Sequence, residues 1–231
     1  MTQEEFKDKV VLITGAGRGL GGPIAEAFAA RGAIVAINDL TPINLDVTLE
    51  RILSAGGRAK DYIFDVSKKI VTQTMIDLVL SDWGRIDILV NHSAIRPHLA
   101  LLTMDEWDWQ RTLDLNLTGP FLTIQRVAQV MRFQGGGVIV NLVSAIKDIQ
   151  DWNGQSAFVA SQAGLVGLTR QAARELAGDH IRLNAICLEQ LSETPSPEDL
   201  KPLVEQLFFL CSNASREITG QILDLAGNPQ S

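Results

Sequence analysis

Short apolar runs alternate along this chain with longer stretches in which apolar and polar residues mix. The runs are five to seven residues long, the length of a buried strand, and the stretches between them are long enough for helices. The pattern therefore predicts strands at Val10–Thr14, Ala33–Asn38, Ala59–Phe64, Ile86–Asn91, Val138–Val143, Ile181–Cys187 and Gln221–Leu225.

Helices are predicted between these strands. Ser67 is expected to cap the third helix, and Thr103 and Glu106 have the spacing of a capping box at the start of the fourth. Pro120 is expected to bend or interrupt the fourth helix, because proline lacks a backbone donor. The predicted helices are Pro23–Arg31, Asn44–Ser54, the stretch from Ser67 to Trp83, Thr103–Phe133, Gln155–Ala177 and Leu200–Cys211.

Strands that alternate with helices through short connections indicate one doubly wound α/β domain. Its seven strands are expected to lie parallel, with right-handed crossovers and helices on both faces of the sheet. No repeat, linker or low-complexity tract divides residues 1–231. In such a sheet, ligands bind at the carboxyl ends of the strands.

The first strand breaks into a glycine-rich turn, and an alanine-rich helix follows. Gly15, Gly19 and Gly21 permit backbone conformations and close approaches that a side chain would prevent. The start of the helix presents backbone N–H groups and the positive end of its dipole. A strand, a glycine turn and a helix predict a pyrophosphate site, although any strand-to-helix turn can use glycine.

Asp39 ends the second strand, 24 residues after Gly15. In a dinucleotide-binding fold, a carboxylate at this distance accepts hydrogen bonds from the adenosine ribose and repels a 2′-phosphate. This predicts NAD as the cofactor and disfavours NADP. The alternative is a structural acid that opens a turn with Thr41 and Pro42.

Charge and cysteine content exclude several classes of partner. The formal net charge is −7 and the basic residues are scattered, which argues against nucleic acid or an anionic membrane as a partner. The chain shows no signal peptide and no apolar run long enough for a membrane anchor, so a cytoplasmic location is expected. Cys187 and Cys211 fit two reduced core thiols better than a disulfide or a metal site.

Several motifs together resemble the classical short-chain dehydrogenases/reductases, including the 3-oxoacyl reductases. The turn Thr14–Gly21 resembles the family's TGxxxGxG motif, Leu89–Ala94 its NNAG strand end, and Ser212–Gly227 its carboxyl-terminal signature. The resemblance spans nearly the whole chain and implies a Rossmann-type fold. The cofactor-binding positions it implies are Gly15, Arg18, Gly19, Leu20, Asp39, Leu40, Asp65, Val66, Asn91 and Ser93.

The resemblance also locates the family's catalytic positions, and two of them depart from the pattern. Asn116 and Ser144 match the catalytic Asn and Ser, but Phe158 and Gln162 stand where the family has its Tyr and Lys. Phenylalanine has no proton to exchange, and glutamine carries no charge to lower the pKa of a neighbour. The family's hydride-transfer chemistry is therefore expected to be severely impaired, and NAD binding weakened.

Other side chains could in principle replace the missing acid. The single tyrosine, Tyr62, is predicted in strand three, away from Ser144. Lys147 and His98 are the alternative proton carriers, although a solvated surface role is expected for Lys147. His92 is expected to be packed or hydrogen-bonded rather than catalytic.

The segment after strand six also departs from the family. Leu188-Glu189 replaces a Pro-Gly pair, and the substrate lid is expected to be shortened to about residues 188–199, with Thr194 near the carboxamide side of the cofactor. The leading hypothesis is a catalytically impaired family member that keeps an NAD-type site. The alternatives are an oxidoreductase that uses Ser144 with Lys147 or His98, and a nucleotide-responsive binding module.

Assembly is the expected role of the impaired protein. Members of the family commonly pair through two long helices, which match 103–133 and 155–177 here. Ala160, Ala163, Gly164 and Gly167 place small residues on one side of the second helix, where they permit close helix packing or ordinary packing against the sheet. The expected partner is a second copy of the chain or an active paralogue.

Overall fold

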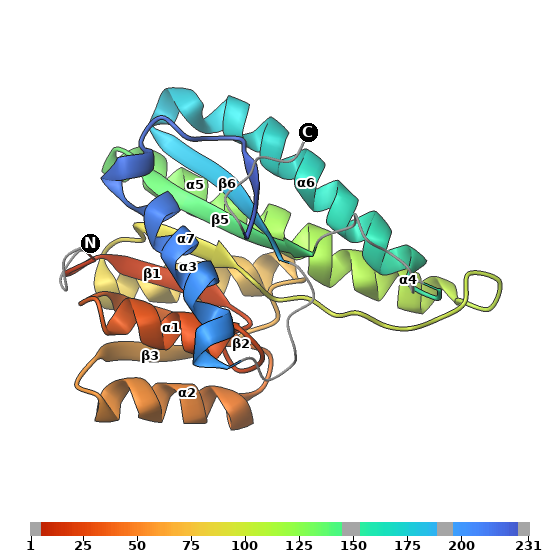
Figure 1. Cartoon of the computed structure of the whole chain (residues 1–231), viewed down its shortest axis with the longest axis horizontal. Helices are drawn as coiled ribbons and strands as arrows, with labels where there is room; N and C mark the ends of the chain where they lie inside the picture. Colours follow the sequence, from red (N-terminus) through yellow and green to blue (C-terminus); the bar gives the residue numbers. More distant parts are fainter. Residues whose placement is uncertain (1–5, 145–152, 189–195, 226–231) are drawn as a thin grey trace.

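Among the residues that the computed structural model describes, 6–144, 153–188 and 196–225, seven parallel strands form one sheet with helices on both faces (Figure 1). The strand order is β3-β2-β1-β4-β5-β6-β7, which confirms the predicted doubly wound single-domain fold. The strands are β1 Val10–Thr14, β2 Ile34–Asp39, β3 Arg58–Ile63, β4 Ile88–Asn91, β5 Gly137–Ser144, β6 Ile181–Leu188 and β7 Ile222–Asp224.

The helices divide between the two faces of the sheet. Helices α1, α2 and α7 pack on one face, and α3, α5 and α6 pack on the other. The central strands are buried on both faces, which explains why their sequences are almost entirely apolar. The helices are α1 Gly21–Ala29, α2 Pro42–Ser54, α3 Lys69–Trp83, α4 Glu106–Leu113, α5 Gly119–Gln134, α6 Ser156–Leu176 and α7 Pro197–Cys211.

The predicted helix Thr103–Phe133 is interrupted before Pro120 rather than bent at it. A π-helix, Asp114–Thr118, separates α4 from α5, and Pro120 lies in the first turn of α5. A proline is tolerated in a first turn, where its missing N–H removes little. The widened turn has a further effect, because it carries Asn116 into the interior.

Helices α1 and α2 begin at Gly21 and Pro42, two residues before the predicted starts, and the predicted caps or starts of three other helices were wrong. Asp105, and not Thr103, caps α4, where its carboxylate accepts from the amide of Asp108 at 2.7 Å. Ser67 does not cap α3, because its hydroxyl donates to Asp65 instead. Helix α7 begins at Pro197 and not at Leu200, since Ser196 and Asp199 form a capping box. Local side-chain bonds decided each case.

Candidate functional site

The glycine turn lies between β1 and α1 at the carboxyl edge of the sheet. Gly15 and Gly19 have φ angles of +69° and +55°, a region that side chains disfavour. A Cβ at Gly21 would clash with the carbonyl oxygen of Gly15, so this glycine lets α1 pack directly against the end of β1. The predicted turn is therefore present with glycines where its geometry needs them.

The start of α1 offers donors to an anion. No side chain caps the helix, and the amides of Gly19 and Leu20 have no hydrogen-bond acceptor within the described part of the chain. The Arg18 side chain is exposed on the same turn, whereas Leu20 is buried. Free amides at a helix start are the usual contacts for a phosphate.

Asp39 lies directly beside the turn. One carboxylate oxygen, Oδ2, accepts from the amide of Gly17 at 3.1 Å, and Oδ1 accepts from the amide of the exposed Leu40 at 2.7 Å. A Cβ on Gly17 would stand 2.8 Å from Oδ2, so glycine at this position makes the contact possible. Each carboxylate oxygen can accept more than one bond, which leaves capacity for ribose hydroxyls.

His92 packs against the turn from the end of β4. Its Nδ1 lies 3.0 Å from the carbonyl oxygen of Gly15, and its ring faces Gly19. Burial lowers the pKa of His92, against the opposing effects of the Gly15 carbonyl and the Asp39 charge. The packed, hydrogen-bonded role expected for His92 agrees with this geometry.

The lowered pKa of His92 makes stability depend on pH. Below the ordinary value of 6.5, the unfolded chain binds a proton that the folded chain resists, so acid favours unfolding. We expect His92→Asn to lose less stability than the wild type as pH falls below 6.5. Urea unfolding at several pH values measures this, and parallel pH curves for the two proteins would contradict it.

The third predicted cofactor contact lies after β3. Asp65 Oδ1 accepts from both the amide and the hydroxyl of Ser67, at 2.9 and 2.6 Å. Val66 is buried, and its carbonyl accepts from Thr72 at 2.9 Å. These bonds fix the segment that holds Asp65 and Val66, two of the cofactor-binding positions that the resemblance implies, and the contact with a cofactor stays a prediction.

The Asn91 side chain is engaged inside the sheet. Its amide donates to Asn141 Oδ1 at 2.9 Å, and its oxygen accepts from Thr123 at 2.8 Å. By contrast, Ser93 lies at the turn, where its amide and that of His92 donate to Thr14 Oγ1. The Asn91 side chain therefore holds the strand ends together. Its predicted contact with a cofactor would have to come from its backbone.

Asn116 is held by the loop that follows β4. Its Oδ1 accepts from the amide of Ile95 and its Nδ2 donates to the carbonyl of Ile95, both at 2.8 Å. A further bond joins Nδ2 to Ser161 Oγ at 3.1 Å. The π-helix thus places Asn116 between this loop and α6, and its catalytic role stays a prediction.

Ser144 and Gln162 are joined by a hydrogen bond. The backbone N–H of Ser144, the last residue of β5, donates to Gln162 Oε1 at 2.9 Å. Gln162 lies on α6 and is buried. The side chain that the resemblance places at the family's lysine position therefore anchors the strand that carries Ser144.

The Phe158 ring is buried beneath an arginine. The guanidinium carbon of Arg96 lies 5.3 Å from the ring centroid, a cation–π distance. Arg96 Nε donates to Gln155 Oε1 at 2.6 Å. A fixed positive charge thus faces the aromatic ring, but a guanidinium stays protonated in proteins and cannot act as an acid.

No pattern in the sequence predicts Arg96 at this place. It is 62 residues from Phe158, and the loop that carries it has no regular pattern. The bonds of Ile95 to Asn116 and of Arg96 to Gln155 hold this loop beside the start of α6.

The side chains that were considered as substitutes for a tyrosine at position 158 are placed as follows. Tyr62 lies on β3, four strands from β5, or about 19 Å across the sheet. Its hydroxyl donates to Asp82 at 2.7 Å, and burial raises its pKa. His98 is exposed, with its ring against Gly154. Lys147, Thr194 and most of the predicted short lid lie outside the described residues.

No group of three or more potential metal ligands occurs among the described residues. In the same part of the chain no helix is both long and apolar enough to cross a membrane. Cys187 and Cys211 form no disulfide; Cys187 is buried and Cys211 half-buried.

Known proteins resemble the chain over nearly its whole length. The model of the short chain dehydrogenase family matches residues 9–202. A 3-oxoacyl-[acyl-carrier-protein] reductase of Thermotoga maritima is 34% identical, covering 96% of this chain and 98% of its own. A (2S)-[(R)-hydroxy(phenyl)methyl]succinyl-CoA dehydrogenase subunit of Thauera aromatica is also 34% identical, covering 94% and 84%.

Solved structures agree with the fold. A short-chain dehydrogenase/reductase of Burkholderia xenovorans superposes with a TM-score of 0.87 at 30% identity, covering 96% of each chain. The structure of an NAD⁺-bound xylitol dehydrogenase superposes with a TM-score of 0.88 at 25% identity, covering 97% of this chain and all of that one. Sequence, sheet order and glycine turn together show that this chain belongs to the short-chain dehydrogenase family.

Proposed function

We propose that this family member keeps a site for NAD(H), does not perform the family's proton transfer, and acts as a subunit of an oligomer. The observation that carries the proposal is the contact made by Gln162. Its carbonyl oxygen accepts from the Ser144 amide, so the position offers a structural hydrogen bond in place of a mobile positive charge.

Phe158 supports the same conclusion. Its ring is buried against Arg96, and a phenyl ring has no proton to give. Neither Arg96 nor Tyr62 is suited to replace it, the first because it keeps its charge and the second because it lies at the other end of the sheet. Loss of a general acid typically lowers a rate by about 10²- to 10⁴-fold.

The residues present fit a nicotinamide dinucleotide. The amides of Gly19 and Leu20 would hold the pyrophosphate, and Asp39 would accept from the adenosine ribose. When bound, the cofactor supplies or accepts a hydride. A relative in the same fold has been solved with NAD⁺. The resemblance implies that a lysine at position 162 would contact the nicotinamide ribose, and the loss of that charged contact is expected to cost about 1.5 to 3 kcal/mol of binding.

Calorimetric titration tests the nucleotide part of the proposal. We expect NADH to bind with a micromolar to millimolar Kd and NADPH to bind at least about tenfold more weakly, because Asp39 repels the 2′-phosphate. Asp39→Ala should reduce this preference, and Asp46→Ala, which removes an exposed acid on α2, should not. Absence of heat with both nucleotides would defeat this part of the proposal.

The proposed assembly uses the outer surfaces of α4, α5 and α6, which lie side by side (Figure 1). Trp107 on α4 is 64% exposed, and Phe121 on α5 is 42% exposed. On α6, Ala160 and Gly167 are exposed, whereas Gly164 packs against Leu117. Large exposed apolar side chains beside small ones are typical of a helix interface. The Thauera relative is itself named as a subunit.

Light scattering tests the assembly. We expect a dimer or tetramer, alone or with an intact paralogue, and we expect Trp107→Glu to shift the mass toward the monomer, because a charge in an apolar interface is costly. Leu53→Glu makes a similar change on exposed α2 and should leave the mass unchanged. A monomeric mass for the wild type, both alone and mixed with an intact paralogue, would contradict the proposed assembly.

A further inference from the structure

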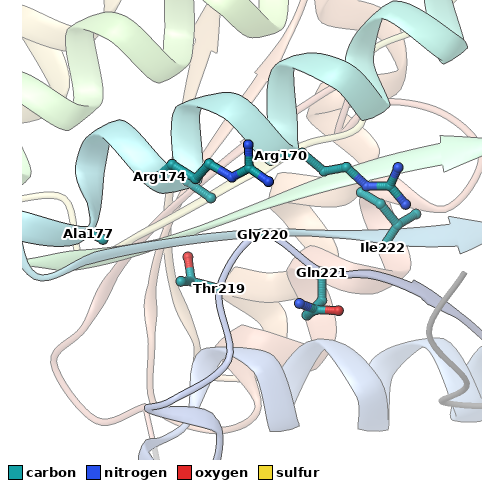
Figure 2. Close-up of a pocket in the computed structure, with 8 residues that line it drawn as sticks. Arg170, Arg174, Ala177, Thr219, Gly220, Gln221 and Ile222 are labelled. Atoms are coloured by element: carbon teal, nitrogen blue, oxygen red, sulfur yellow. The ribbon is translucent and has the colours of Figure 1, made fainter. Parts of the chain in front are cut away.

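A cavity of about 550 Å³ lies between the second half of α6 and residues 219–222, which lead into β7 (Figure 2). It is remote from the candidate site. Arg174, on its wall, follows Gln162 by twelve residues, or about 18 Å along a helix. The cavity lies toward the opposite end of α6 from Ser144, so its ligand would not be the dinucleotide.

The wall formed by α6 is basic. Arg170 and Arg174 are four residues apart and therefore share one helix face, and no acid is among the lining residues. Arg174 makes no hydrogen bond or ion pair with any residue that the structure describes. The neighbouring acids are engaged elsewhere: Glu175 accepts from Gln171 at 2.8 Å, and Asp179 pairs with Arg132 at 3.1 Å.

The charge of this cavity opposes that of the chain. The formal net charge is −7, yet two arginines line this cavity and none of the other lining residues is acidic. A concave basic surface concentrates anions.

The opposite wall adds a neutral donor and an apolar floor. Thr219 Oγ1 accepts from the amide of Leu183 at 3.1 Å, which leaves its own O–H to donate. Figure 2 shows Thr219 across the cavity from α6. Ala173 and Ile222 are buried and form the apolar part of the lining.

We propose that this cavity binds a phosphate monoester. The phosphate group would lie against Arg170 and Arg174, with the organic group on Ala173 and Ile222. Two guanidinium groups and a hydroxyl suit the three terminal oxygens of a phosphate better than the two of a carboxylate. A cavity of about 550 Å³ is also of the size that holds a small organic molecule rather than an inorganic ion alone.

Calorimetric titration with phenyl phosphate, inorganic phosphate and benzoate tests the assignment. Phenyl phosphate is expected to bind more tightly than either of the others, because it fills both the basic and the apolar parts. Arg174→Gln should weaken its binding at least about tenfold, since a charge-assisted contact is lost. Arg51→Gln, which removes an exposed arginine on α2, is the matched control and should leave binding unchanged.

A second variant covers the case in which Arg174→Gln fails to fold. Ala177→Glu places a carboxylate at an exposed lining position. It should weaken the binding of phenyl phosphate by about the same factor as Arg174→Gln. The assignment is overturned if phenyl phosphate does not bind, if both cavity variants bind it normally, or if NADH competes with it. It is also overturned if phenyl phosphate dissociates an oligomer, because the cavity would then be occupied by protein.

Discussion

The double variant Phe158→Tyr, Gln162→Lys is expected to reduce ketones with NADH about 10²- to 10⁴-fold faster than the wild type. The tyrosine restores a hydroxyl that can give a proton, and the lysine restores a charge that lowers its pKa. Arg96, whose guanidinium lies 5.3 Å from the present ring centroid, favours the ionised form of that hydroxyl as well. Steady-state rates with a panel of ketones and 3-oxoacyl thioesters measure the gain.

Two controls separate restored chemistry from a general effect. Phe158→Tyr alone should gain less than the double variant, because the position at 162 still lacks a charge. Adding Ser144→Ala to the double variant should remove the gain. Equal rates for the wild type and the double variant would show that positions 158 and 162 do not limit the reaction.

Asn91→Leu is expected to lower the free energy of unfolding by about 2 to 4 kcal/mol. The leucine is similar in size but leaves Asn141 Oδ1 without its buried donor and removes the acceptor of Thr123. Thr123 retains the carbonyls of Gly119 and Pro120 as alternative acceptors, which limits the loss. Urea unfolding measures the change.

The control for Asn91→Leu is Asn44→Leu, at an exposed position on α2, which should change stability little. A loss below about 1 kcal/mol in Asn91→Leu would show that the network contributes little to the fold. The same variant also tests the site. If Asn91 only holds the strand ends together, Asn91→Leu should change the free energy of NADH binding less than it changes the free energy of unfolding.

The architecture could be predicted because each strand carries its own signal. The apolar runs of β1, β2 and β4 are buried on both faces of the sheet, which separates them from the mixed apolar and polar sequence of the helices; the edge strand β3 is more polar and more exposed. The glycine turn and Asp39 could be placed for a similar reason, since both follow directly from the ends of adjacent strands β1 and β2.

The contacts at the proposed catalytic positions could not be predicted. Gln162 reaches Ser144 across 18 residues, and Arg96 reaches Phe158 across 62, so both pairs depend on how α6 packs beside β5 and the loop after β4. The π-helix that turns Asn116 inward was also missed, because its sequence reads as ordinary helix.

The proposed phosphate-binding cavity was missed for a related reason. In the sequence, Arg170 and Arg174 look like two solvated residues on a helix. They line a cavity only because a segment near β7, about 45 residues later, packs opposite them. Charge scattered along a sequence can therefore gather on one surface.

The wild-type turnover with NAD(H) over the same panel of alcohols, ketones and thioesters tests the central claim most directly. We expect NADH to bind, and we expect turnover no higher than that of Ser144→Ala. Steady wild-type turnover that disappears in Ser144→Ala would contradict the account, because a proton would then be passing through this site without Tyr or Lys.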